Sequence, residues 1–80
     1  MFINKAKDGK NNLCGVKIAE KRKKLGISQR ELADRLQLIG LDVDKNAIQR
    51  IECGKRFVTD IELKALSETL KITVSDLLSL

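Results

Sequence analysis

Apolar residues recur at helical spacing from position 12 onward and fall into five groups. Residues three or four positions apart share one face of an α-helix, so each group predicts an amphipathic helix. The expected inward positions are Leu13, Val16, Ile18, Ala19, Arg22 and Leu25, then Leu32, Ala33 and Leu36, then Ile48 and Ile51, then Ile61, Leu63, Leu66 and Leu70, and finally Leu77 and Leu78. No stretch of sufficient length alternates between apolar and polar residues, as a half-buried β-strand would. The pattern predicts an all-α fold, a compact five-helix bundle.

Polar residues at the starts of these groups have the spacing of capping boxes, which occurs at Ser28–Glu31, Thr59–Glu62 and Thr73–Asp76. In such a box the hydroxyl accepts from the third helical N–H, and the acidic side chain accepts from the N–H of the capping residue. Asp44 is expected to cap a third helix over residues 45 to about 52. Each of these four positions therefore predicts a helix start.

Glycines are expected to end two of the helices, Gly26 the first and Gly54 the third. Residues 1–11 are polar, contain three lysines and show no periodicity, which favours a flexible N-terminal arm. Residues 12–80 then form a single domain. No apolar run approaches the roughly 20 residues that cross a bilayer, and the first residues do not resemble a signal peptide, so we expect a cytoplasmic protein without a membrane partner.

The composition argues against catalysis and against a metal site. The chain has no histidine and only two cysteines, Cys14 and Cys53. Two thiols alone cannot complete a tetrahedral zinc site, and a nucleophile has no histidine to activate it. No glycine cluster resembles a phosphate-binding loop. We therefore expect no enzyme activity, no metal, no cofactor and two free thiols.

Positive charge is concentrated in the first two-thirds of the chain. Residues 1–56 hold 14 Lys or Arg against 7 Asp or Glu, whereas residues 57–80 hold 2 against 4, and the whole chain carries +5. A basic surface on one part of a small domain is typical of proteins that bind a polyanion. The charge alone does not identify that polyanion.

A set of residues spread over all five groups has a familiar spacing: Ile18, Arg22, residues 25–29, 31–33, Leu36, Ile48, Ile51, Glu52, residues 54–56, Leu63, Leu66, Leu70, residues 72–74, Leu77 and Leu78. This spacing resembles the Xre-like helix-turn-helix family of phage Cro and CI repressors, over roughly residues 14–78. The resemblance implies a lambda-repressor-like fold and a DNA-binding helix-turn-helix domain within residues 12–80. It also places Cys14 in the core and Cys53 at the surface.

In that family the third helix lies in the major groove of double-stranded DNA. The matching base-reading positions are Lys45, Asn46, Gln49 and Arg50. Lysine and arginine can donate to guanine, and asparagine and glutamine can pair with adenine. The alternative is that these four side chains form an ordinary solvated face.

Other matching positions imply contacts with the phosphate backbone, which position a protein without reading sequence. They are Gln29 and Arg30 at the start of the second helix, and Lys55 and Arg56 after Gly54. Solvated charge is the default reading of Arg30. The resemblance further implies a structural ion pair between Arg22 and Glu52.

Three features depart from the family pattern. The interval from Leu36 to Ile48 is about five residues longer than usual, so a loop should replace the tight turn, anchored by Leu38, Ile39, Leu41 and Val43. Lys71 stands where a helix-ending glycine is usual, which predicts strain. Asp42 and Asp44 place negative charge near the third helix, where it opposes phosphate.

The leading hypothesis is a sequence-specific transcriptional regulator. A homodimer on a palindromic operator would suit the family, but nothing in the sequence establishes dimerisation. The alternative is an adaptor that binds a protein partner, such as an antitoxin-type subunit, with DNA binding secondary. Exposed apolar residues in the loop over residues 39–43 or in the arm would favour that alternative.

Overall fold

The computed structural model describes residues 9–78, and these form five helices with no strand among them. The helices are α1 (Gly15–Lys24), α2 (Gln29–Leu38), α3 (Lys45–Glu52), α4 (Asp60–Leu70) and α5 (Val74–Leu77). The predicted all-α, five-helix fold is confirmed. None of the described helices is long and apolar enough to cross a membrane.

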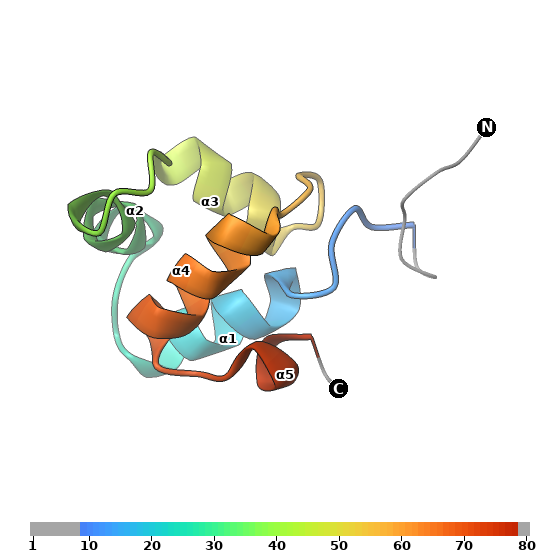
Figure 1. The fold of residues 1–80 in the computed structure, drawn as a ribbon. Helices are drawn as coiled ribbons and strands as arrows, with labels where there is room; N and C mark the ends of the chain where they lie inside the picture. The colour runs from blue at the N-terminus through green and yellow to red at the C-terminus, as the bar shows by residue number, and fades with distance from the viewer. Residues whose placement is uncertain (1–8, 79–80) are drawn as a thin grey trace.

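The helices pack around one core, with α4 running between α3 and α1 in the view of Figure 1. Helix α3 packs against α1 and α2, while α4 packs against α1, α2 and α5. Among residues 9–78, the core consists of twelve buried apolar residues, namely Cys14, Ile18, Ile27, Leu32, Ala33, Leu36, Val43, Ile48, Ile51, Leu66, Leu70 and Leu77. Every helix contributes to this core, and the buried side of α3 packs against the rest of the domain.

Several residues expected to face inward are exposed. In α1 the buried position is Ile18, and Val16 lies two residues away, on the opposite side of the helix. Leu13 precedes α1 and Leu25 is its C-cap, so neither lies on the helix face that packs. Ile61 is 73% exposed because α4 buries a narrower stripe four residues apart, which Ile61 does not share. The apolar pattern therefore overestimated the width of the buried faces.

All four predicted N-caps form, but only one is a full capping box. The side chains of Ser28, Asp44, Thr59 and Thr73 each accept a hydrogen bond from the backbone three residues on. Among the described helices, only Glu62 of α4 completes the reciprocal bond, with Thr59 N donating to its Oε1 at 3.0 Å. For the other two predicted boxes, Ser28–Glu31 and Thr73–Asp76, the bond to the hydroxyl forms, but the predicted bond from the capping N–H to the acidic side chain does not.

The helix ends also match expectation. Gly26 and Gly54 follow α1 and α3 with φ of +72° and +80°, the left-handed region that glycine enters without a steric penalty. Lys71 ends α4 in the same region, with φ 56° and ψ 46°. The strain predicted for this position is therefore present in the backbone.

The loop between α2 and α3 is anchored at only one end. Val43 is buried, and its carbonyl accepts a hydrogen bond from Gln37 Nε2 at 2.7 Å. Leu41 is half-buried against the core. Leu38 and Ile39 instead expose 86% and 54% of their surface. The sequence was wrong to place these last two against the core, because α2 turns their positions away from it.

Candidate nucleic-acid interface

Four polar side chains project from the outer face of α3. Lys45, Asn46, Gln49 and Arg50 are all exposed, and they are the four positions for which the family resemblance implied base contacts. On the opposite face, Ile48 and Ile51 are completely buried in the core. The spacing of the two sets places every donor of α3 outward and every large apolar side chain inward. The helix is thus a rigid rod that presents amide and cationic groups to solvent.

The carboxylate of Asp44 caps the start of α3. Asp44 Oδ1 accepts from Ala47 N at 2.8 Å, which satisfies one of the free N–H groups of the first turn. The carboxylate also stabilises the positive end of the helix dipole. Asp42 lies exposed nearby in the loop. Negative charge therefore borders the outer face at its N-terminal end, as the sequence suggested.

The last residue of α3 joins three helices through one carboxylate. Arg22 Nε donates to Glu52 Oε2 at 2.7 Å, and Arg22 Nη2 donates to Oε1 at 3.1 Å. The ion pair expected between these residues is therefore present. Gln29 Nε2, at the start of α2, donates to Oε1 at 3.0 Å. The carboxylate consequently links the start of α2 and the first helix to the end of α3.

Arg22 makes one more bond, from Nη1 to Ile27 O at 2.9 Å. The hydrogen bonds that Arg22 donates to Glu52, together with the negative charge of that carboxylate, raise the pKa of Arg22 above its ordinary value, against the opposing effect of burial. The guanidinium is therefore permanently charged and holds the turn between α1 and α2 as well as the end of α3. The sequence identified the pair but missed its bonds to Gln29 and Ile27.

The four positions expected to contact phosphate differ in their surroundings. Arg30 and Lys55 are exposed. Gln29 is half-buried because its amide is bonded to Glu52, although its backbone lies at the positive end of α2. Arg56 Nη2 donates to Glu62 Oε2 at 2.8 Å and Nη1 to Phe57 O at 3.4 Å. Gln29 and Arg56 thus have structural partners that the sequence did not reveal, and all four phosphate contacts stay predictions.

The partner of Arg56 is the buried carboxylate of the capping box. Burial alone would raise the pKa of Glu62, but hydrogen bonds from Arg56 and Thr59 and the charge of Arg56 outweigh it and hold the pKa below its ordinary value. Glu62 is therefore ionised and ties α4 to the segment after α3.

Two asparagines before α1 bind the segment after α3, and sequence reasoning missed them. Asn11 N donates to Gly54 O, and Asn11 Nδ2 donates to Lys55 O, both at 2.8 Å. Asn12 Nδ2 donates to Arg56 O at 2.8 Å. Asn11 had been assigned to a flexible arm, and these bonds correct that assignment for its last residue. Residues 1–8 of the expected arm lie outside the described part of the chain.

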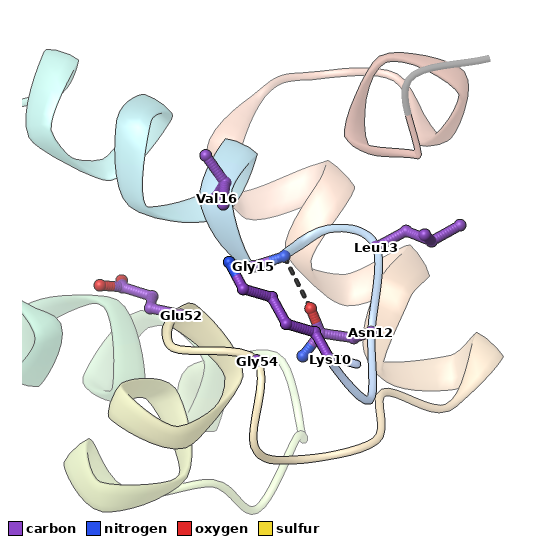
Figure 2. A pocket seen from close by; sticks show the side chains of 7 residues that line it. All are labelled: Lys10, Asn12, Leu13, Gly15, Val16, Glu52 and Gly54. Carbon is purple, nitrogen blue, oxygen red and sulfur yellow. Dashed lines mark hydrogen bonds between the residues drawn. The ribbon is translucent and has the colours of Figure 1, made fainter. Parts of the chain in front are cut away.

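A small pocket lies beside Asn12, between the start of α1 and the end of α3 (Figure 2). Asn12 Oδ1 accepts from Gly15 N at 2.9 Å at the start of α1. A Cβ on Gly15 would stand 2.3 Å from Ile51 O, so the backbones of α1 and α3 are in direct contact. The pocket is lined by Lys10, Asn12, Leu13, Gly15, Val16, Glu52 and Gly54.

Within residues 9–78, no cluster of three or more histidine, cysteine, aspartate or glutamate residues could hold a metal ion. Both cysteines are free thiols, with Cys14 buried and Cys53 exposed at the end of α3. Burial raises the pKa of the Cys14 thiol. The buried position of Cys14 and the exposed position of Cys53 agree with those that the family resemblance implied.

Comparison with known proteins relates the chain to regulators of transcription. The P22 c2 repressor, solved in complex with synthetic operator 9T, has a TM-score of 0.71 and 31% identity over 84% of this chain and 94% of that one. The restriction-modification controller protein C.AhdI from Aeromonas hydrophila has a TM-score of 0.69 and 27% identity, over 79% and 88% of the two chains. The clp gene regulator ClgR from C. glutamicum shares the fold, with a TM-score of 0.73 and 23% identity over 86% and 83%.

The sequence itself was compared with individual curated proteins and with profiles of protein families. A search among curated proteins finds no significant match. The sequence profile of the helix-turn-helix family matches residues 18–77, which span all of α2 to α5 and most of α1. The chain therefore belongs to the Xre-like helix-turn-helix family, of the Cro and CI type.

Proposed function

We propose that this protein is a sequence-specific transcriptional regulator that inserts α3 into the major groove of DNA and acts in the cytoplasm. The carrying observation is the outer face of α3, where Lys45, Asn46, Gln49 and Arg50 are exposed together. A major groove admits one α-helix, and these side chains match the donors and acceptors on guanine and adenine edges. The family relationship supports the same assignment.

Phosphate contacts would flank the reading helix. Lys55 follows the end of α3, and Gln29 and Arg30 stand at the start of α2, where backbone N–H groups and the helix dipole favour an anion. Arg56 lies beside Lys55 and keeps about a third of its side chain exposed despite its bond to Glu62. These contacts would set the register of α3 on the duplex.

A salt series tests the proposal. Binding of fluorescent duplex DNA is measured by anisotropy from 50 to 300 mM salt, first with a random pool and then with sites selected from it. We expect affinity to fall steeply with salt, with an exponent of about 0.9 for each phosphate neutralised. Selected sites should bind more tightly than the pool at every salt concentration. A protein that binds no duplex at low salt is not a DNA-reading regulator.

Selected sites also test the oligomeric state. Two copies bound to a palindrome would place their recognition helices one helical turn apart, about 34 Å. We expect the selected sites to contain two inverted half-sites at that spacing. A single asymmetric site, bound with one protein per duplex, would support a monomer instead.

Protein binding is the second candidate, and the exposed pair Leu38 and Ile39 favours it. Adjacent large apolar side chains on a small domain are a feature of interaction surfaces. If the adaptor role dominates, DNA binding should be weak at any salt. Replacing both residues with serine should then abolish capture of the partner while leaving the melting temperature unchanged. If DNA reading dominates, the same variant should bind the selected sites normally.

A further inference from the structure

The backbone of residues 54–56, directly after α3, is held by hydrogen bonds on both sides. Its three carbonyls accept from the pair Asn11–Asn12, each at 2.8 Å. Its N–H groups turn the other way, and those of Lys55 and Arg56 donate to Arg50 O at 2.9 and 3.3 Å. The exposed side chain of Lys55 therefore rises from a segment with little freedom to move.

The bonds to Arg50 O connect this segment to the reading face of α3. Arg50 presents its side chain to solvent and its carbonyl to residues 55 and 56. The backbone of Lys55 is thus bonded to a residue in the last turn of α3. The distance between the Cα atoms of Lys55 and Arg50 therefore stays constant as long as these hydrogen bonds hold residues 54–56 in place.

The asparagine pair is itself anchored at its other end. Asn12 Nδ2 also donates to Ile51 O at 3.1 Å, and Asn12 Oδ1 accepts from Gly15 N at 2.9 Å. Figure 2 shows Asn12 directed to the first residue of α1, beside the side chain of Lys10. The stem of Lys10 in turn packs where a Cβ of Gly54 would stand. Two asparagines therefore bridge α1, the end of α3 and the segment beyond it.

Asn11 is not an optimal choice for stability alone. Its Oδ1 is shielded from solvent and has no hydrogen-bond partner. An unsatisfied buried acceptor is destabilising and offsets the stabilisation that the hydrogen bond from Nδ2 contributes. Positions where local stability is sacrificed are commonly functional.

We propose that Asn11 and Asn12 are positioning residues for DNA binding, which hold Lys55 at a fixed offset from Arg50. A phosphate contact by Lys55 and a base contact by Arg50 then form together, without loss of loop entropy on binding. This inference rests on the proposed function. It assigns the asparagine pair to the DNA-binding machinery although neither amide reads DNA.

A double-mutant cycle tests the inference, using Asn11→Ala, Lys55→Ala and the double variant with a selected duplex. Asn11→Ala keeps the backbone bond to Gly54 and removes both the amide donor and the unsatisfied acceptor, so the melting temperature should change little. We expect Lys55→Ala to lower the salt exponent by about 0.9, a loss of about eightfold in affinity at 0.1 M salt. Asn11→Ala should give a similar loss, and the double variant should lose no more than Lys55→Ala alone.

Amide hydrogen exchange provides a second readout in the free protein. In Asn11→Ala the N–H groups of Lys55 and Arg56 should exchange faster, while those of α4 should not. Ser67→Ala is the matched control, because Ser67 Oγ also bonds a backbone carbonyl, that of Ile72, at the distant α4–α5 corner. It should leave affinity, salt exponent and the exchange of residues 55 and 56 unchanged.

The remaining outcomes separate the two proposals. If the wild type binds no duplex, both fall. If the wild type binds but Lys55→Ala has no effect, or if the losses from Asn11→Ala and Lys55→Ala add, the positioning role is overturned and the reading helix survives. If Asn11→Ala changes only the melting temperature, the asparagine pair is structural.

Discussion

Arg22 and Glu52 form a two-bond ion pair that is nearly removed from solvent, with the two side chains exposing 12% and 8% of their surfaces. Nε meets Oε2 at 2.7 Å and Nη2 meets Oε1 at 3.1 Å, the parallel geometry that suits a guanidinium and a carboxylate. The same carboxylate receives Gln29. The orientation of α3 is therefore set by charge as well as by packing.

Arg22→Ala should lower the free energy of unfolding by about 3 kcal/mol. The variant leaves Glu52 shielded from solvent without its cation, and breaking such a pair costs more than the pair contributes. Urea denaturation measures the change. Arg35→Ala, an exposed arginine of α2, is the matched control and should stay within about 0.5 kcal/mol of the wild type. An unchanged midpoint for Arg22→Ala would contradict the role given to the pair.

The parts of the fold that follow local rules could be predicted from the sequence. Ser28, Asp44, Thr59 and Thr73 cap helices because a short oxygen side chain at that position reaches an N–H three residues on. The inward placement of Ile48 and Ile51 followed in the same way from the helical period. Neither inference needs knowledge of the tertiary structure.

Contacts between distant parts of the chain could not be predicted in this way. Asn11 and Asn12 bond residues 39 to 44 positions away, and nothing in their neighbours indicates it. The bond between Arg56 and Glu62 was hidden for another reason, since a carboxylate of a capping box appears already satisfied. Leu38 and Ile61 were misplaced because periodicity gives the direction of a face but not how much of it another helix covers.

Lys71→Gly should stabilise the protein by about 0.5–1 kcal/mol. Lys71 occupies the left-handed region at the end of α4, where a side chain clashes with the following carbonyl and glycine does not. Part of the gain is offset by the greater freedom of glycine in the unfolded chain. Lys64→Gly within α4 is the control and should destabilise by about 1 kcal/mol. Thermal melts that gave both variants the same sign would refute the explanation.

Gly15→Ala should destabilise the protein by about 1–3 kcal/mol, although alanine is the better helix former. The new Cβ would lie 2.3 Å from the carbonyl oxygen of Ile51, a backbone atom that moves only if α1 and α3 separate. Chemical denaturation measures the loss. Helix propensity alone predicts the opposite sign, so a more stable variant would show that the two helices are not in close contact.

The loss of stability at acidic pH should depend in part on Glu62. Its pKa in the folded protein lies below the ordinary value of 4.5, so its stabilising contribution is present above that value and is lost as the pH falls through the lower, folded pKa. Glu62→Gln should therefore be less stable than the wild type at pH 7, and the difference should shrink below about pH 4.5. Glu68→Gln, an exposed position on α4, serves as the control. A difference that stayed constant from pH 7 to pH 3 would exclude the linkage.

Arg50→Ala should weaken binding to a selected duplex by about 1–3 kcal/mol and relax the preference at one base pair, if its guanidinium pairs with guanine. Its side chain is exposed in the last turn of α3. Lys24→Ala, an exposed lysine at the end of α1 beside α5, is the control and should change neither affinity nor preference. Affinity is measured on the selected site and on the three variants that carry another base pair at one position. An equal loss on every version would make Arg50 a phosphate contact, because phosphates carry no sequence information.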